Sequence, residues 1–274
     1  MNNNPLKQYF RRPAVYFKLP SGGNDYAPGI VDIPESGDLP VYPMTAIDEI
    51  TARTPDALFN GTALIELIKS CIPNIKDPWA VSSNDMDAVL IAIKIATSGD
   101  TLELDTSCPK CEETGTYGVN LVPILNTLRS GNYNEPLVIG DLTIKLKPLQ
   151  YRDMNDVALA NFEVQRTYMN LDKIESEEER TKIGKDALEK ITLLTMGLLS
   201  NAIEYIQTTT TVVDQKEYIL DFLKNCDRNT FMKIRDYNSE LRANNEIKPL
   251  HITCDGCGNE YDQPFTLSPV DFFE

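Results

Sequence analysis

Four of the six cysteines form two Cys-x-x-Cys pairs, Cys108 with Cys111 and Cys254 with Cys257, and 142 residues separate the pairs. A Cys-x-x-Cys turn presents two sulfur atoms to one ion, and zinc in structural sites takes four tetrahedral ligands with no open position. Each pair lies between short segments that are typical of β-strands, as in a zinc ribbon. The sequence therefore predicts one structural zinc ion on these four cysteines, which would tie the middle of the chain to its C-terminal end.

The distance between the pairs is unusual, because the two halves of a zinc ribbon normally lie within about 20 residues of each other. The helices between the pairs would then form a long insertion into the ribbon. Gly258 directly after the second pair and Gly115 shortly after the first would relieve crowding in the two turns. Four thiolates also bind iron, so the pattern leaves the choice between zinc and iron open.

Redox catalysis and disulfide bonding are the alternatives to a metal site. A thioredoxin-like motif places one pair at the start of a helix after a strand, within a βαβ unit, and neither pair has that context. Disulfides are rare in a reducing compartment, which we expect here because the first residues, MNNNPLKQYF, include no apolar stretch of signal-peptide length. Both alternatives therefore fit less well than zinc.

The chain is strongly acidic, with 41 acidic and 26 basic residues and a formal net charge of −15. This balance repels the phosphates of nucleic acid, so we expect no nucleic-acid partner. The most apolar segment, residues 88–96, is interrupted by Lys94 and is shorter than the roughly 20 residues that cross a bilayer, so we expect no membrane partner. A soluble intracellular protein is the expectation.

Most of the chain after residue 44 is predicted to be helical. Residues 84–97 are apolar on nearly every side, which predicts a buried central helix. Residues 151–245 are predicted to be helical throughout, including one long helix from Ser176 to about Gln207. Helices therefore dominate the predicted core.

Two β-hairpins are predicted, over residues 101–120 around the first cysteine pair and over residues 137–146, where Gly140-Asp141 forms a favoured two-residue turn. The predicted fold class is α+β: a mainly helical domain with short β-hairpins, a split four-cysteine module like a zinc ribbon, and an extended N-terminal arm. The predicted divisions are 1–43 for the arm, 44–150 for the helical core with the first zinc knuckle and the hairpins, 151–247 for the helical insertion, and 248–274 for the second zinc knuckle and the C-terminal tail.

The N-terminal arm holds seven of the 17 prolines, which excludes long helices there. One strand is predicted over residues 14–19, and aromatic residues occur along the whole arm. Such an arm either wraps around its own domain or docks on a neighbouring subunit, and the sequence leaves both interpretations open.

Catalytic motifs are missing from the sequence. His251 is the only histidine, which excludes metalloprotease sites that need two histidines, and a lone histidine is more often a surface or packed residue than a ligand. Gly22-Gly23 lacks the lysine and the helix of a phosphate-binding loop. We therefore predict no catalytic residues, no cofactor other than the structural zinc, and no enzymatic activity.

Several strings of the sequence resemble a known family. They are NPLKQYFRRPAVYFKLPSGG, VYPMTAIDEITARTPDALFNG, IKSCIPNI, DMDAVLIAIKIAT and the two cysteine pairs. They resemble a baseplate protein of T-even-like contractile-tailed bacteriophages, a family usually described as a baseplate hub subunit or hub assembly protein. The resemblance covers roughly residues 4 to 150 and the end of the chain from about residue 248.

The resemblance implies a virion or tail-assembly role through contacts with other phage baseplate and tail proteins. It places the protein in the virion tail baseplate and, during assembly, in the host cytoplasm, and it allows for oligomers within the assembly. Whether the subunit stays in the finished baseplate or acts only during assembly is left open. The predicted function is that of a non-enzymatic structural or assembly subunit of the hub, stabilised by one structural zinc.

The alternative is a zinc-ribbon protein that binds nucleic acid or takes part in transcription. Such a protein needs basic and aromatic residues around its knuckles. Only one lysine, Lys110, lies close to the pairs, and the other charged neighbours are acidic: Asp105, Glu112, Glu113, Asp255 and Glu260. A metal-dependent or thiol enzyme is a third class, which would require an open ligand position or a depressed thiol pKa.

Overall fold

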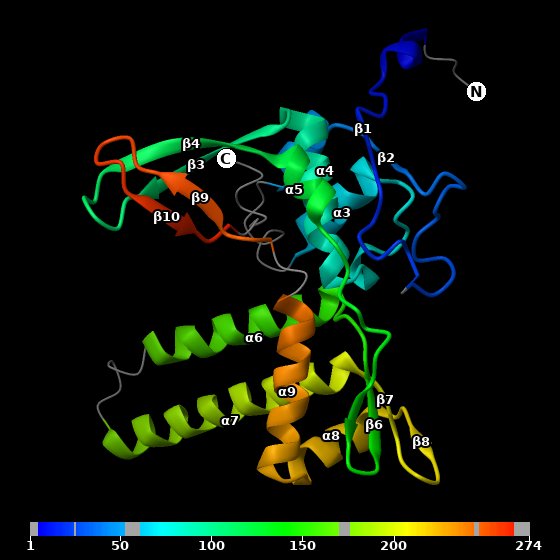
Figure 1. Ribbon diagram of the computed structural model, residues 1–274, viewed down its shortest axis with the longest axis vertical. Helices are drawn as coiled ribbons and strands as arrows, with labels where there is room; N and C mark the ends of the chain where they lie inside the picture. The colour runs from blue at the N-terminus through cyan, green and yellow to red at the C-terminus, as the bar shows by residue number, and fades with distance from the viewer. Residues whose placement is uncertain (1–4, 25, 53–60, 170–175, 244–246, 266–274) are drawn as a thin grey trace. The chain divides into compact units, whose positions relative to one another are not determined.

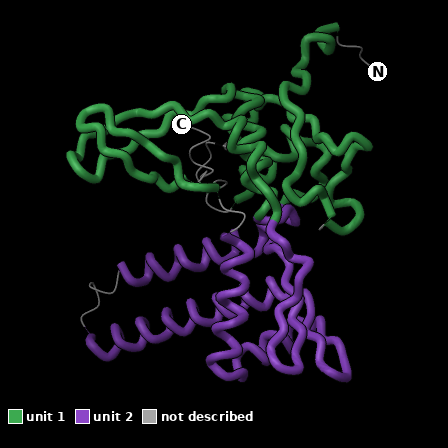
Figure 2. Tube along the Cα trace, in the orientation of Figure 1, with its two compact units in different colours: residues 1–78, 84–130, 245–274 green, residues 79–83, 131–244 purple. Residues whose placement is uncertain are grey.

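A computed structural model describes residues 5–24, 26–52, 61–169, 176–243 and 247–265 (Figure 1). The chain divides into two compact units, each made of segments that are distant in sequence (Figure 2). Unit 1 comprises residues 1–78, 84–130 and 245–274, and unit 2 comprises residues 79–83 and 131–244. Residues 266–274 of the predicted C-terminal tail lie outside the described residues.

Unit 1 combines helices with antiparallel two-stranded sheets. Its elements in chain order are η1 (Pro5–Tyr9), β1 (Val15–Phe17), β2 (Leu39–Val41), α1 (Ala46–Ala52), α3 (Thr62–Cys71), α4 (Ser83–Ser98), β3 (Thr101–Ser107), β4 (Thr114–Asn120), α5 (Leu121–Thr127), β9 (Leu250–Thr253) and β10 (Glu260–Gln263), and the short η2 (Pro78–Ala80) lies at the boundary of the units. Three hairpin-like pairs form, β1 with β2, β3 with β4, and β9 with β10. The last two pairs carry the cysteines at their turns.

The centre of unit 1 is built from α3 and α4. On α4, nine residues between Asn84 and Ile93 are buried, which confirms the prediction of a central helix that is apolar on nearly every side. Six of the ten residues of α3 are buried as well. The burial of these apolar side chains stabilises unit 1 through the hydrophobic effect.

The N-terminal segment is attached to this core by two polar networks, of which the first is buried around Asp85 and the second is partly buried around Arg11. Asp85 of α4 is fully buried, and it accepts hydrogen bonds from the Ser21 backbone N–H (2.9 Å), the Ser21 hydroxyl (2.5 Å) and the Tyr26 hydroxyl (2.6 Å). Strand β1 pairs with β2 and buries Phe17 against Leu39. Because a buried carboxylate needs its hydrogen-bond donors, Asp85 holds Ser21 and Tyr26 in place.

The second network centres on Arg11. Its guanidinium donates to the carbonyl of Pro43 (2.6 Å), to the carbonyl and hydroxyl of Ser70 (2.8 and 2.7 Å) and to the Asp48 carboxylate (3.3 Å). The same carboxylate accepts from Thr45 N–H at 2.7 Å, and the Thr45 hydroxyl accepts from Asp48 N–H at 3.2 Å, so it also closes the first turn of α1. Arg11 thereby links the arm to the ends of α1 and α3.

Unit 2 is a four-stranded antiparallel sheet, in the order β5-β6-β7-β8, packed against helices. Its elements are β5 (Leu137–Ile139), β6 (Leu142–Leu146), α6 (Tyr151–Met169), α7 (Glu177–Ala202), β7 (Ile203–Gln207), β8 (Val212–Val213), α8 (Lys216–Asn225) and α9 (Arg228–Ala243). The core joins the sheet, the C-terminal end of α7, α8 and α9 through Tyr133, Ile144, Leu146, Leu199, Ile203, Ile206, Ile219, Leu223, Ile234 and Leu241. Figure 1 shows α6 and α7 as long helices that extend away from this sheet.

The prediction of one helix from Ser176 to about Gln207, within a stretch that is helical throughout, was wrong at its C-terminal end. The helix begins after Ser176, whose hydroxyl accepts from Glu179 N–H, but it ends at Ala202. Residues Ile203–Gln207 form β7 beside β6 and bury Ile203 and Ile206. The Lys216 ammonium donates to the Ser200 and Ile203 carbonyls at this junction, which satisfies acceptors that a longer helix would have bonded internally.

These elements confirm an α+β fold with eight α-helices and small antiparallel sheets among the described residues. None of the helices in those ranges is long and apolar enough to span a bilayer. The division of the sequence at residues 43, 150 and 247 stays a prediction.

Adjacent arginines provide a test of how the arm is attached, because Arg12 is exposed and makes only one long contact, 3.5 Å to the Gln8 carbonyl. We expect Arg11→Ala to lower the free energy of unfolding by about 2 kcal/mol, since it leaves Asp48 without its charged donor. Arg12→Ala should change it by less than about 0.5 kcal/mol. Urea denaturation of both variants followed by circular dichroism measures the difference, and equal effects would contradict the role of Arg11.

The same network predicts a pH dependence. Burial opposes ionisation of Asp48, but hydrogen bonds from Thr45 and Ser70 and the Arg11 charge hold its pKa below the ordinary value of 3.8. A carboxyl with a lowered pKa stabilises the fold fully above its unfolded pKa, and this contribution is lost as the pH falls through the folded value. The gap between wild type and Arg11→Ala should therefore narrow below about pH 4.

Candidate metal centre

The two cysteine pairs occupy equivalent six-residue turns. Residues 108–113 connect β3 to β4, and residues 254–259 connect β9 to β10. The strands on both sides confirm the predicted hairpin setting of each pair. Figure 1 shows the two hairpins side by side within unit 1, and a 2.9 Å hydrogen bond from the Thr106 hydroxyl to Gln263 Oε1 joins them.

The turns share one hydrogen-bond pattern. In the first turn, Glu112 N–H donates to the Cys108 carbonyl and Cys108 N–H donates to the Glu113 carbonyl, both at 2.9 Å. In the second turn, Gly258 N–H donates to the Cys254 carbonyl and Cys254 N–H donates to the Asn259 carbonyl, again at 2.9 Å. The backbone therefore folds the same way twice, as expected when two knuckles face one ion.

The residue after each second cysteine has a left-handed backbone, with φ of 60° at Glu112 and 66° at Gly258. Glu112 is the one non-glycine residue with positive φ among the described residues. The prediction that Gly115 relieves the first turn was wrong, because Gly115 lies in β4 and pairs with Thr106. The backbone strain of the first turn is therefore at Glu112, where the left-handed conformation of a residue with a side chain costs about 1–2 kcal/mol of free energy.

The turns bring all four sulfur atoms together, within 4.8 Å of one another. Cys108 Sγ lies 3.8 Å from Cys257 Sγ, and Cys111 Sγ lies 3.6 Å from Cys254 Sγ. Four ligands at about 2.3 Å around a tetrahedral zinc ion would stand about 3.8 Å apart. A disulfide needs about 2.05 Å, and all four thiols are free.

Burial and hydrogen bonding treat the four sulfurs unequally. The first cysteine of each pair, Cys108 or Cys254, is buried, and the second is exposed. Cys108 Sγ accepts from Lys110 N–H at 3.4 Å and from the Asn259 side-chain amide at 3.9 Å. Such N–H donors stabilise a thiolate and are typical of the surroundings of bound sulfur.

The pKa values of the thiols indicate that a cation would stabilise the cluster. Burial opposes ionisation of Cys108, but backbone hydrogen bonds from Cys111 and Lys110 lower its pKa to about 6. At Cys111 the Glu113 backbone favours the thiolate, yet the neighbouring sulfurs and burial raise the pKa to about 12. One thiolate thus forms readily while further negative charge is resisted, and a divalent cation removes that resistance.

A lowered thiol pKa is also a property of reactive cysteines. Cys108, however, is only 1% exposed, so a substrate could not reach its sulfur without displacing the turn. His251, the lone histidine, lies outside the sulfur cluster and is exposed; its ring bonds Asp262 at 3.1 Å, which raises its pKa. The two remaining cysteines, Cys71 and Cys226, are also outside the cluster; Cys71 is buried and Cys226 is partly buried.

Comparison with protein families identifies the chain. The family model described as T4 bacteriophage base plate protein matches residues 43–274. The chain belongs to this base plate protein family. The match contains both cysteine turns and also the helices of residues 151–247, which the resemblance seen in the sequence had left out. Searches of curated proteins and of solved structures gave no match.

Membership of the base plate family confirms the predicted phage baseplate protein, and the matched model does not distinguish the hub from other baseplate positions. Nothing in the match names a catalytic residue. The cysteine turns are therefore the site of this base plate protein whose geometry is best defined.

The left-handed residue of each turn provides a test of the knuckle geometry. Because glycine adopts this conformation without a steric cost, Glu112→Gly should raise the free energy of unfolding by about 0.5–1 kcal/mol, and Gly258→Glu should lower it by a similar amount. Glu112→Ala is the control, since it removes the carboxylate but keeps the steric cost. Thermal unfolding of the three variants measures these shifts, and an equal gain from Glu112→Ala and Glu112→Gly would trace the effect to charge instead.

Proposed function

We propose that this base plate protein is a non-enzymatic structural or assembly subunit of the hub of a contractile tail. The observation that carries the baseplate role is the family match over residues 43–274. The place in the hub is supported by the resemblance of residues 4–150 and of the end of the chain to hub proteins. The acidic composition and the missing catalytic motifs support a protein that acts through contacts with other tail proteins. Its place is then the virion baseplate and, during assembly, the host cytoplasm.

A structural zinc ion on Cys108, Cys111, Cys254 and Cys257 completes the proposal. The sulfur separations of 3.6 and 3.8 Å fit a tetrahedral four-thiolate site. Bound there, the ion would supply a cross-link and neutralise thiolate charge, and the protein ligands leave no open position for chemistry. The site joins two hairpins, so its role is to hold the β9–β10 hairpin of the C-terminal segment against the β3–β4 hairpin.

The N-terminal end offers a contact surface for a neighbouring subunit. Leu6, Tyr9 and Phe10 are 57–77% exposed, and no residue of η1 is buried. Arg11 and the residues after it are attached to unit 1. We therefore propose that the arm both covers its own unit, from residue 11 onward, and docks through residues 5–10.

The nucleic-acid-binding alternative is disfavoured by the charges around the turns. Both hairpins carry mainly carboxylates, and Lys110 is the only basic residue within the two turns themselves. A surface of this sign repels phosphate. A tail protein that contacts other proteins fits these surroundings better.

Phage genetics tests the proposed function. A phage with an early stop codon in this gene should produce heads and no complete baseplates in a host that cannot suppress the stop, and plasmid-encoded wild-type protein should restore tails. A plasmid-encoded variant without residues 1–10 should fold and bind metal but fail to restore them. Normal tails from the mutant phage, with altered transcription instead, would contradict the proposal and favour the nucleic-acid-binding alternative.

A further inference from the structure

The helical hairpin of α6 and α7 is covered only in part by the rest of unit 2. Of the 19 residues of α6 only Val164 is buried, and of the 26 residues of α7 only Ala187, Leu199, Ser200 and Ala202 are. A helix in a globular protein usually gains its stability by burying an apolar face. This hairpin leaves much of that face open.

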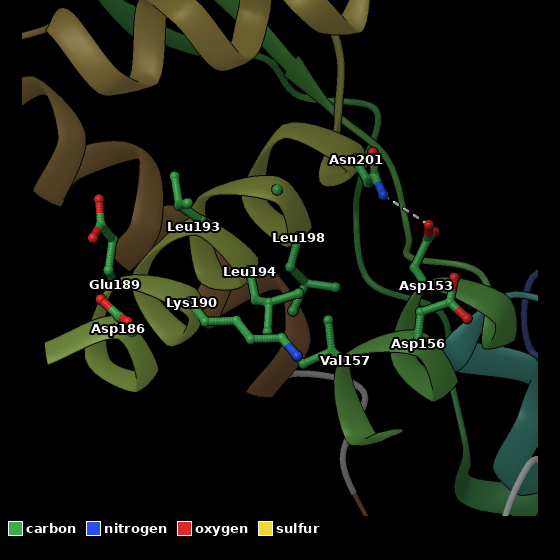
Figure 3. A pocket seen from close by; sticks show the side chains of 11 residues that line it. Asp153, Asp156, Val157, Asp186, Glu189, Lys190, Leu193, Leu194, Leu198 and Asn201 are labelled. Carbon is green, nitrogen blue, oxygen red and sulfur yellow. Dashed lines mark hydrogen bonds between the residues drawn. The ribbon is translucent and has the colours of Figure 1, made fainter. Parts of the chain in front are cut away.

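The open face contains a groove between the two helices (Figure 3). A cavity of about 540 Å³ is lined by α6 and α7 residues, and its apolar part is formed by Val157, Leu193, Leu194 and Leu198. Leu193 is 48% exposed, so this apolar surface is in contact with water. Gly197 also lines the groove, and a Cβ atom there would meet no atom within 4 Å.

The groove continues along the hairpin. A second hollow of about 320 Å³ shares Asp186 and Lys190 with the first and reaches Arg166 on α6. On α7 the lining residues run from Ile183 to Asn201. That distance is about 27 Å along the helix, which matches about 18 residues of another α-helix.

The rim of the larger cavity is negatively charged. Four carboxylates line it, those of Asp153, Asp156, Asp186 and Glu189. The one cation, Lys190, bonds Glu163 on α6 at 2.7 Å, so it is already neutralised. Asp153 is held by the Asn201 side-chain amide at 2.8 Å, as Figure 3 shows.

We infer that this groove binds one amphipathic α-helix of another protein, with apolar residues at helical spacing on one face and lysine or arginine beside them. The apolar residues would cover the leucines, and the basic residues would lie against the acidic rim. That the partner is a tail protein rests on the proposed function, whereas the chemistry of the groove does not.

A synthetic peptide tests the chemistry directly. The probe is a fluorescent 18-residue peptide of leucine, alanine and lysine, with leucines at helical spacing, and its twin has glutamate for every lysine. Fluorescence anisotropy with the full-length protein should give micromolar binding of the lysine peptide and at least tenfold weaker binding of the twin, with a preference that falls as salt rises. No binding, or equal binding of both peptides, would overturn the inference.

Two glycines of α7 provide a matched pair of variants. A side chain at either Gly197 or Gly184 would meet no atom within 4 Å at its Cβ, but only Gly197 lines the groove. Gly197→Arg places bulk and a positive charge in the groove and should weaken binding of the lysine peptide at least tenfold. Gly184→Arg should leave it unchanged, and both should keep the wild-type circular dichroism, because arginine favours helix more than glycine does. Equal weakening by both would overturn the assignment to the groove.

Two further experiments distinguish a failure of the groove inference from a failure of the proposed function. Phages with Gly197→Arg should fail to form tails and phages with Gly184→Arg should succeed. If both succeed while the phage with the stop codon fails, the groove inference is overturned and the role in assembly stands. If sedimentation shows that the wild-type protein is a dimer and Gly197→Arg a monomer, the occupant is a second copy and the inferred partner is wrong.

Discussion

Four sulfur atoms from two hairpins that are distant in sequence lie within 4.8 Å of one another. Thiolates at that distance repel one another unless a cation lies between them. This constraint governs the organisation of unit 1. The β3–β4 and β9–β10 hairpins are small, and two-stranded hairpins of this kind are marginally stable alone in water. A metal ion would join the two hairpins into one module. It would thereby attach the C-terminal segment, which carries β9 and β10, to the N-terminal part of unit 1.

In the rest of unit 1, segments that are distant in sequence are also joined at single points, but by polar side chains and not by a metal. Asp85 holds Ser21 and Tyr26 against α4, and Arg11 holds the arm to α1 and α3. Unit 2 is built differently, around one sheet with a continuous apolar core. Its long α6–α7 hairpin extends beyond that core. The two units therefore have separate roles in the proposed assembly: the contacts of unit 1 join its own segments, and unit 2 provides a binding groove.

Local patterns in the sequence predicted the elements whose determinants are local. The predicted helix over residues 84–97 is buried between Asn84 and Ile93 because apolar residues cover nearly every side there, and the Gly140-Asp141 turn joins β5 to β6 as its residue types require. The cysteine pairs could also be predicted, since ligand spacing is a local property of each turn. Their convergence was inferred only because a four-ligand site needs both pairs.

Features decided by tertiary contacts were missed. Residues 203–207 form a strand because β6 offers them hydrogen-bond partners, which the helical pattern before them does not reveal. The strained position of Glu112 carries no signal in its own residue type, although Gly258 at the equivalent place in the second turn could have pointed to it. The short helix α5 was also missed; Asn120, whose side chain accepts from Val122 N–H at 3.0 Å, is a cap signal directly before it.

The central claim is that one zinc ion joins the two hairpins. X-ray absorption at the zinc edge, on full-length protein purified without added metal, measures the ligand set directly. The account predicts about one zinc per chain with four sulfur ligands at about 2.3 Å, and loss of the zinc in Cys108→Ser and in Cys257→Ser. A folded protein without zinc, an iron signal in its place, or a zinc ion with two sulfur ligands from a single hairpin would contradict it.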